Sequence, residues 1–269
     1  DGYTRKRKPM ELPSILLEND RLRATFLPTL GGRLWSLYDK LEARDLLYVN
    51  PVFQPANLAV RNAWFSGGVE WNVGIRGHTP YTCSTLFAAR VQAKDFPVLR
   101  LYEWDRIRRV HYQLDAYLPP GSPMLHVFVR IRNPRDVQIP MYWWSNAAVP
   151  ETDDLRIITP ADYAYKMAYD GRMARAKLPE WGGYDITRPT SAPSASDSFF
   201  VVEEPSRPYI AAIYGDGHGT FQASTPRLKG RKLFVWGMGP GGRRWQEFLS
   251  QPGEAYVEIQ AGLARTQYE

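Results

Sequence analysis

Apolar and polar residues alternate with a period of two along most of the chain, and this alternation limits the fold more than any other feature. In the segment 125–132, LHVFVRIR, every second residue is Leu, Val or Ile, and His or Arg occupies most positions between them. The segment 110–117, VHYQLDAY, alternates in the same way. Successive side chains of a β-strand point to opposite faces, so the pattern predicts strands with one buried face. No long amphipathic helix is predicted.

Turn signals separate the predicted strands. They are rich in glycine and proline and occur at 119–121, 133–134, 215–217 and 239–242. A chain of 269 residues, 44% of them hydrophobic, is long enough for one large all-β domain or two small ones. Many antiparallel strands over this length predict one domain over 1–269, a large all-β antiparallel sandwich of two broad sheets.

Two stretches need a separate interpretation. The segment 161–196 mixes residue types and ends in a run rich in Ser, Pro and Ala, so we expect a long irregular loop, which in a compact domain is usually functional or disordered. The glycine-rich segment 239–242 lacks the Gly-Lys-Ser/Thr ending of a phosphate-binding loop and any helix after it. We therefore expect a hairpin there that places Trp236 and Trp245 near the rim of a sheet.

Composition narrows the classes of partner. The net charge is +6, and apart from the segment 5–8 the basic residues are scattered, whereas a nucleic-acid binder concentrates them on one stripe. No apolar run reaches the ~18 residues of a membrane span. The single cysteine, Cys83, excludes an internal disulfide and slightly favours the cytoplasm, while export stays open. Nothing in the sequence indicates the oligomeric state.

The segment 256–260, YVEIQ, is the first candidate for chemistry. In a strand, Tyr256, Glu258 and Gln260 share one face, and Val257 and Ile259 share the other. A phenol, a carboxylate and a carboxamide in a row suit sugar hydroxyls, which need both donors and acceptors. The alternative is an ordinary solvated strand face, where an exposed Glu is the usual case.

The segment 142–146, YWWSN, is the second candidate. Trp144 and Asn146 share one face of a strand, and Trp143 lies on the other. One tryptophan would then lie in the core and the other could form a stacking platform for a sugar. The alternative is that both are buried, since Trp is highly buried on average.

The segment 65–72, FSGGVEWN, places Glu70 between two glycines and a Trp-Asn pair. Glycine weakens a strand interior, so a plain strand would not have two of them there. Glu70 is either a working carboxylate in an aromatic-lined pocket or a charge at the end of a hairpin. His78 follows eight residues later.

The sequence predicts no metal and no cofactor. No pair among the four histidines has the spacing of metal ligands within one element. The acids of the segment 151–154 form a weak pattern that fits a solvated loop better than a metal site. No Gly-x-Ser-x-Gly motif of a serine hydrolase is present.

Four stretches together carry a family resemblance: 17–50, WFSGGVEWNVGIRGHTP at 64–80, YWWSNAAVPE at 142–151 and YVEIQAGLARTQ at 256–267. They resemble a bacterial family of unassigned function in the galactose mutarotase-like, or aldose 1-epimerase-like, superfamily. Many members carry tetratricopeptide repeats, which this chain lacks. The resemblance covers nearly the whole chain and implies a β-supersandwich with a carbohydrate site on its concave sheet.

The resemblance also implies roles for residues. VEIQ is similar to the Glu-Thr-Gln-like segment of the epimerases, so Glu258 matches the base that takes the anomeric proton, and Gln260 its neighbour. The passage 133–146 looks like the one that ends in their acidic His, and here that position holds Asn146. Asparagine cannot act as a general acid. Glu70 would then be the acid, with its pKa raised by the neighbouring side chains of Trp64, Phe65 and Trp71.

The sequence therefore predicts a carbohydrate-active enzyme that does acid/base chemistry at or near an anomeric centre. The absent His favours glycosidase-like over aldose-epimerase-like chemistry, and two carboxylates facing one sugar would suit a glycosidase. Alternatives are a non-catalytic sugar-binding module and a degenerate scaffold. The partner expected is a sugar or oligosaccharide. The residues expected to bind it are Arg33, Asn72, His78, Trp144, Asn146, Trp236 and Gln260.

Overall fold

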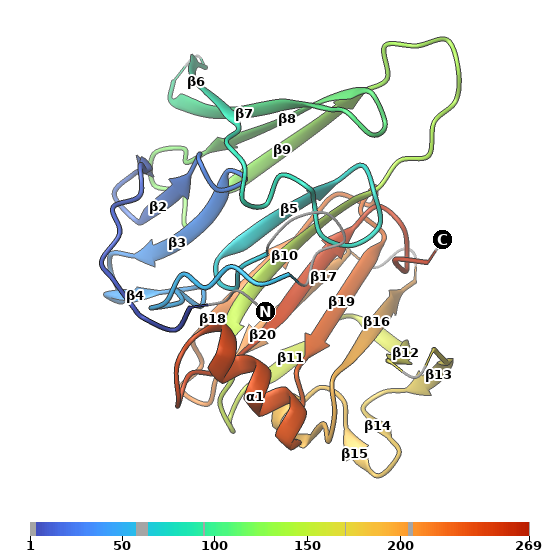
Figure 1. Cartoon of the computed structure of the whole chain (residues 1–269). Coiled ribbons are helices and arrows are strands. Elements are labelled where there is room, and N and C mark those ends of the chain that lie inside the picture. The colour runs from blue at the N-terminus through green and yellow to red at the C-terminus, as the bar shows by residue number, and fades with distance from the viewer. Residues whose placement is uncertain (1–3, 58–63, 94, 170, 204–206, 269) are drawn as a thin grey trace.

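Antiparallel strands dominate the regular secondary structure of the computed structural model, which describes residues 4–57, 64–93, 95–169, 171–203 and 207–268 (Figure 1). The largest sheet runs in the order β1 (Ile15–Glu18), β2 (Leu22–Leu27), β3 (Arg33–Asp39), β5 (Val69–Val73), β10 (Trp143–Pro150), β20 (Tyr256–Gly262), β19 (Gly230–Val235), β16 (Ser196–Val202), β12 (Ala161–Ala168) and β13 (Met173–Lys177). The short β4 (Arg44–Asp45) pairs with β3. This architecture confirms the predicted all-β, antiparallel class.

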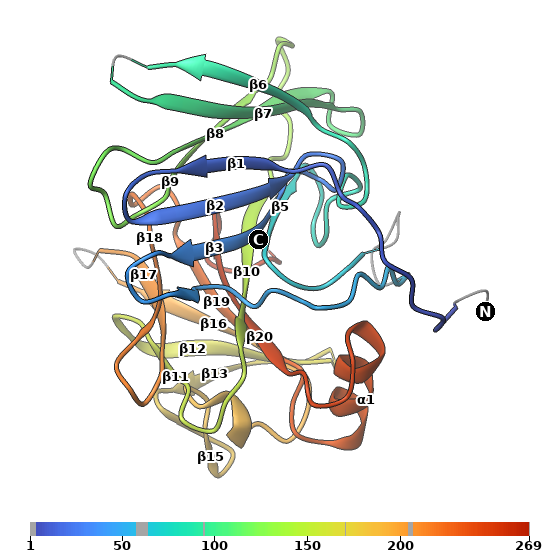
Figure 2. The same ribbon diagram turned by 90° about the vertical axis from the view of Figure 1, so that its left-hand side faces the viewer.

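Three smaller sheets accompany the large one. They comprise β6 (Phe87–Gln92), β7 (Pro97–Asp105), β8 (Val110–Tyr117) and β9 (His126–Arg132); β11 (Arg156–Ile158), β17 (Tyr209–Ile213) and β18 (Gly219–Ala223); and β14 (Glu180–Trp181) with β15 (Tyr184–Asp185). Both views place β6–β9 at one end of the molecule and α1 (Pro240–Leu249) at the other (Figure 1, Figure 2). In the part of the chain that is described, no helix is long and apolar enough to cross a membrane.

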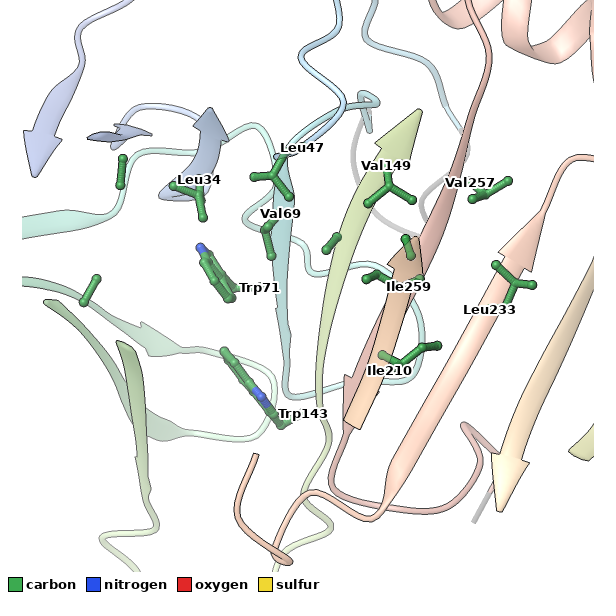
Figure 3. Packing of buried hydrophobic residues seen from close by; sticks show 14 of the residues in the cluster. Leu34, Leu47, Val69, Trp71, Trp143, Val149, Ile210, Leu233, Val257 and Ile259 are labelled. Carbon is green, nitrogen blue, oxygen red and sulfur yellow. The ribbon is translucent and has the colours of Figure 1, made fainter. Parts of the chain in front are cut away.

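The hydrophobic core lies between one face of the large sheet and two of the smaller sheets, namely β6–β9 and β11–β17–β18. Val257 and Ile259 of β20 point into it, as their alternation predicts (Figure 3). Ile210 of β17 packs in the same core, and Leu101 of β7 enters it from the other small sheet. Because strand faces alternate, the residues between these apolar ones face the opposite side of the large sheet.

That opposite face carries a row of buried polar side chains at the centre of the large sheet. Asn146 on β10 lies opposite Glu70 on β5 and Gln260 on β20, and Lys232 on β19 lies opposite Gln260. All four are less than 9% exposed. Buried polar groups need partners or a function, so this row positions the candidate site.

The expectation of a long irregular loop over 161–196 is wrong. This segment forms β12 to β15 and a short 3-10 turn, Pro189–Ser191. The strand β12 pairs with β13 on one side and with β16, far along the sequence, on the other. Such long-range pairing compensates for the weak local alternation, and Ala164 and Ala176 pack into the core.

The expectation of a hairpin at 239–242 is also wrong, because the ten-residue helix α1 begins there. Pro240 occupies the start of the helix, where its fixed φ is favourable and its missing N–H costs no hydrogen bond. Trp245, Phe248 and Leu249 are three and four residues apart, so they share one side of the helix.

Candidate functional site

A pocket of about 920 Å³ lies on the polar face of the large sheet. The strands β10, β19 and β20 form its floor, and its walls come from the segments 76–78 and 193–195, the start of α1 and the C-terminal residues 267–268. Its volume is in the range of small-molecule sites, roughly 300–1,000 Å³.

Glu258 lies on the floor of this pocket and is 6% exposed. Its Oε2 accepts a 2.7 Å hydrogen bond from the amide of Gln260. The pKa of Glu258 is raised, and burial is the largest cause. The negative charge of Glu70 raises it further, whereas the positive charges of His78 and Lys232 partly oppose this rise. A buried carboxyl with a raised pKa in a pocket is suited to accept and return a proton.

Glu70 lies in a layer behind the pocket rather than on its surface. Its Oε2 is 2.7 Å from Nδ1 of His78 and accepts hydrogen bonds from Nε1 of Trp64 at 3.3 Å and Nδ2 of Asn72 at 3.2 Å. Its other oxygen is 3.9 Å from the guanidinium of Arg33. Trp64, the amide of Asn72 and Arg33 present only donors or positive charge, and a protonated His78 donates as well, so the site favours the carboxylate form of Glu70.

These partners reverse the pKa direction expected for Glu70. Burial by itself would raise the pKa of Glu70, but the charge and hydrogen bond of His78 and the charge of Arg33 lower it to about 2. The expected rise is therefore wrong. Trp71 stacks on Trp143 on the core face, 6.3 Å between ring centroids, so it does not desolvate the carboxyl.

Phe65 packs against Arg33, a neighbour of Glu70, rather than against the carboxyl of Glu70. Its ring lies 4.0 Å from the guanidinium carbon of Arg33. The guanidinium in turn donates to the carbonyl of Gly67 at 3.0 Å and to the hydroxyl of Thr82 at 2.8 Å. Arg33, only 3% exposed, is thus held as a fixed positive charge behind Glu70.

His78 forms part of the pocket wall, with its side chain 28% exposed. Burial lowers its pKa, but the charge and hydrogen bond of Glu70 outweigh that effect, so the pKa of His78 is raised. Gly74 and Gly77 have φ values of 90° and 92°, which allow the chain leaving β5 to fold back over the sheet. Asn72 fastens this turn by accepting the backbone N–H of Thr79 at 2.6 Å.

The structure therefore divides the predicted site residues into three groups. Five of them line the pocket: Glu258, His78, Asn146, Trp236 and Gln260. Three form the buried layer behind His78: Glu70, Arg33 and Asn72. Trp144 belongs to neither group.

Trp144 is 1% exposed and offers no surface on which a sugar could stack. Its indole lies over Gly262 and Gly230 of the two strands that follow β10 in the sheet. A Cβ on Gly262 would come within 2.1 Å of this ring, so the indole occupies the space that two side chains would otherwise fill. With Trp143 at 3% exposure, both tryptophans are buried, as in the alternative considered above.

Sequence reasoning missed a buried ion pair in the pocket. Nζ of Lys232 lies 3.0 Å from Oδ1 of Asp197, with both side chains no more than 6% exposed. The same ammonium donates to Oε1 of Gln267 at 2.9 Å. The available signal was the alternation of Lys232 with Leu233 and Val235, which places a charge in the middle of a strand. Its pairing with Gln260 could not be read from spacing.

The pocket also has an acceptor without a partner. Oδ1 of Asn146 is buried and makes no hydrogen bond to any described residue. A hydroxyl-bearing ligand could supply the donor. Within the ranges that the structure covers, no group of three or more His, Cys, Asp or Glu side chains could hold a metal ion.

Comparison with known proteins identifies the family and the fold. The family model described as "Domain of unknown function (DUF5107)" matches residues 1–269. A TPR-domain containing protein from Parabacteroides distasonis ATCC 8503 superposes with a TM-score of 0.88 at 20% identity, over 99% of this chain and 45% of that protein. The chain thus spans less than half the length of that relative.

Two further structures share the fold across most of their own length. A galactose mutarotase-like protein from Clostridium acetobutylicum has a TM-score of 0.65 at 11% identity, covering 95% of this chain and 87% of that one. A protein from Escherichia coli K12 provisionally named aldose 1-epimerase has a TM-score of 0.59 at 12% identity, covering 93% and 87%. The galactose mutarotase-like fold predicted from the sequence is confirmed. Identities this low carry the fold alone.

Proposed function

Because the chain belongs to the DUF5107 family, a domain of unknown function, we infer its activity from its own site and propose that it binds a reducing sugar and interconverts its anomers. The observation that carries this proposal is that Glu258 and His78 line one pocket and perturb each other's pKa through their charges. An acid and a base facing one ligand are what anomer exchange requires.

Glu258 is the base in this proposal. As a carboxylate it takes the proton of the anomeric hydroxyl, and the electron pair of that O–H bond forms the aldehyde carbonyl as the bond between the anomeric carbon and the ring oxygen breaks. Its hydrogen bond from Gln260 keeps the carboxylate in one orientation. Its raised pKa makes it a stronger base than an exposed Glu.

His78 is the acid. Its Nδ1 is engaged by Glu70 at 2.7 Å, which leaves the Nε2 proton for the ligand. This proton passes to the ring oxygen as the ring opens. Rotation about the bond between the first two carbons, followed by the reverse proton transfers, closes the other anomer and restores both groups.

Glu70 acts through His78 and is a positioning residue. A carboxyl whose pKa is about 2 carries no proton to donate near neutral pH, and Glu70 does not line the pocket. Its charge raises the pKa of the imidazole and so favours the protonated form, and the contact between Oε2 and Nδ1 fixes the orientation of the ring. In this proposal His78, which comes from another segment of the chain, supplies the acid that the epimerases have at the position occupied here by Asn146.

Hydroxyl recognition falls to the polar floor of the pocket. Asn146 offers its unpaired Oδ1 as an acceptor, Lys232 offers donors, and Gln260 offers a donor and an acceptor.

The lining of the pocket disfavours a glycosidase, which needs two carboxyl groups beside the scissile bond. The only carboxylates among the described lining residues are Glu258 and Asp197, and Asp197 is already paired with Lys232.

The proposal is tested by measuring anomer exchange of freshly dissolved sugars by polarimetry and by NMR. Glu258→Gln is expected to abolish catalysed exchange, and His78→Asn to reduce it at least about 100-fold, the usual contribution of general acid–base catalysis. Glu42→Gln, which alters an exposed carboxylate on another strand connection, is the control. Circular dichroism verifies that each variant is folded.

Two outcomes would contradict the proposal. Unchanged exchange in Glu258→Gln would exclude Glu258 as the base. Sugar binding by the wild type with no catalysed exchange would favour a non-catalytic sugar-binding module.

A further inference from the structure

The pocket has two chemically different ends, with Glu258 between them. On the floor, Glu258 lies opposite Phe234 of β19, whereas Gln260, two residues further along β20, lies opposite Lys232. The polar end therefore holds a carboxamide and an ammonium group, and it continues to Gln267. The other end leads from Phe234 to the tryptophans beyond β19.

The aromatic end is built around Trp236, which follows β19 and is 8% exposed. Phe234 packs edge-on against it, with ring centroids 4.9 Å apart and planes at 84°. Tyr256 supports it from β20 at 6.2 Å and 71°. These contacts immobilise the indole, and its Nε1 makes no hydrogen bond to any described residue.

Trp245 extends this surface from α1. Its ring lies nearly parallel to that of Trp236, 6.3 Å between centroids and 25° between planes, and it is 41% exposed. The helix is held close to the strand end by a glycine, since a Cβ on Gly242 would lie 2.1 Å from the carbonyl oxygen of Trp236. Two indoles from different elements thus form one wall of the pocket.

The volume of the pocket exceeds the needs of one sugar ring. Its 920 Å³ lies near the upper end of the range that accommodates drug-sized ligands, roughly 300–1,000 Å³, and a hexose is smaller than such ligands. A hexose placed over Glu258 and the polar end would leave the aromatic end vacant. The C–H faces of a second pyranose ring are apolar and fit flat aromatic surfaces.

We propose, on the basis of the function proposed above, that the substrate is a reducing oligosaccharide, whose reducing-end ring lies at the polar end while the next ring stacks on Trp236 and Trp245. The anomeric hydroxyl of the first ring stays free to react at Glu258. The second ring is then attached through a different hydroxyl of the first ring. The two tryptophans set the preference for chain length and take no part in proton transfer.

The test compares exchange rates for the monosaccharides glucose and galactose with those for the reducing disaccharides maltose, cellobiose and lactose. The wild type is expected to have the higher kcat/KM with at least one of the disaccharides. Trp245→Ala is expected to lower kcat/KM for that disaccharide about tenfold, the scale of one aromatic contact in a binding site, and to leave the monosaccharides within about twofold. Trp245→Phe is expected to recover part of the loss.

Phe87→Ala is the matched control, because Phe87 is an aromatic residue of β6 that is 60% exposed and lies outside the pocket. Equal effects of Trp245→Ala on both sugar classes, or no effect on either, would overturn the inference while leaving the proposed function intact. Wild-type exchange that does not distinguish the classes would do the same. Absence of catalysed exchange with every sugar would overturn both.

Discussion

Replacing Glu70 by Gln tests the electrostatic role of the layer behind the pocket. The substitution keeps the shape of the side chain and an oxygen that can accept from Trp64 or His78, but it removes the negative charge. Glu70 is 3% exposed and its carboxylate lies 2.7 Å from His78 and 3.9 Å from Arg33. The charge therefore acts in a poorly solvated environment, where it is screened little by salt.

The size of the effect follows from the pKa of Glu70, which falls from 4.5 to about 2. That difference corresponds to about 3 kcal/mol of unfolding free energy. A lowered carboxyl pKa stabilises fully above the unfolded value of 4.5, and this contribution is lost as the pH falls towards 2. The pKa of His78 is raised, so its contribution is complete below 6.5 and is lost as the pH rises through the folded value. The variant should differ most from the wild type between pH 4.5 and 6.5.

Urea unfolding at about pH 3, 5.5 and 8 measures this dependence, with the midpoint and slope fitted at each pH. Glu42→Gln, at an exposed position, should stay within about 0.5 kcal/mol of the wild type at every pH. A Glu70→Gln difference of the same size at all three pH values would refute the ion-pair argument. In the pH–rate profile, the alkaline limb, where the proposed acid His78 loses its proton, should also move to lower pH in Glu70→Gln.

Two further predictions concern stability. Glu258→Gln should raise the unfolding free energy near neutral pH, because burial raises the pKa of Glu258 and its ionised form is therefore destabilising there. A lower melting temperature in circular dichroism would contradict this. Gly262→Ala should cost about 3 kcal/mol in urea unfolding, since its Cβ would lie 2.1 Å from the Trp144 ring. Gly241→Ala, in the first turn of α1 with nothing within 4 Å of the added Cβ, should instead stabilise by about 0.5 kcal/mol, and the opposite order of these two glycine variants would refute the packing argument.

The fold class could be predicted from the sequence because strand alternation is a local property. The assignment of Val257 and Ile259 to one face and of Glu258 and Gln260 to the other required only the period of two. The structure places the first pair in the core and the second in the pocket. Where the local pattern was weak, as in 161–196, the prediction was wrong, since pairing of β12 with β16 stabilises that region.

The tryptophans show the limit of residue type as a signal. Trp144 and Trp236 carry the same side chain and both were expected to bind a sugar, yet of the two only Trp236 lines the pocket. Trp144 is covered because Gly230 and Gly262 leave room for its indole on the neighbouring strands. Which residues neighbour a tryptophan depends on sheet order, which no local pattern reports.

The sequence by itself determined which side chains could do chemistry and on which face of a strand each would lie. Only the tertiary structure decided their roles, because β5, β10, β20 and β19 come from distant parts of the chain and pair side by side. That pairing, with the glycine turn after β5, places His78 beside Glu70 and in the lining of the same pocket as Glu258. A pKa depends on the charges and solvent around a group, so the same carboxyl that the sequence marks as an acid becomes, in the folded protein, the charge that raises the pKa of His78.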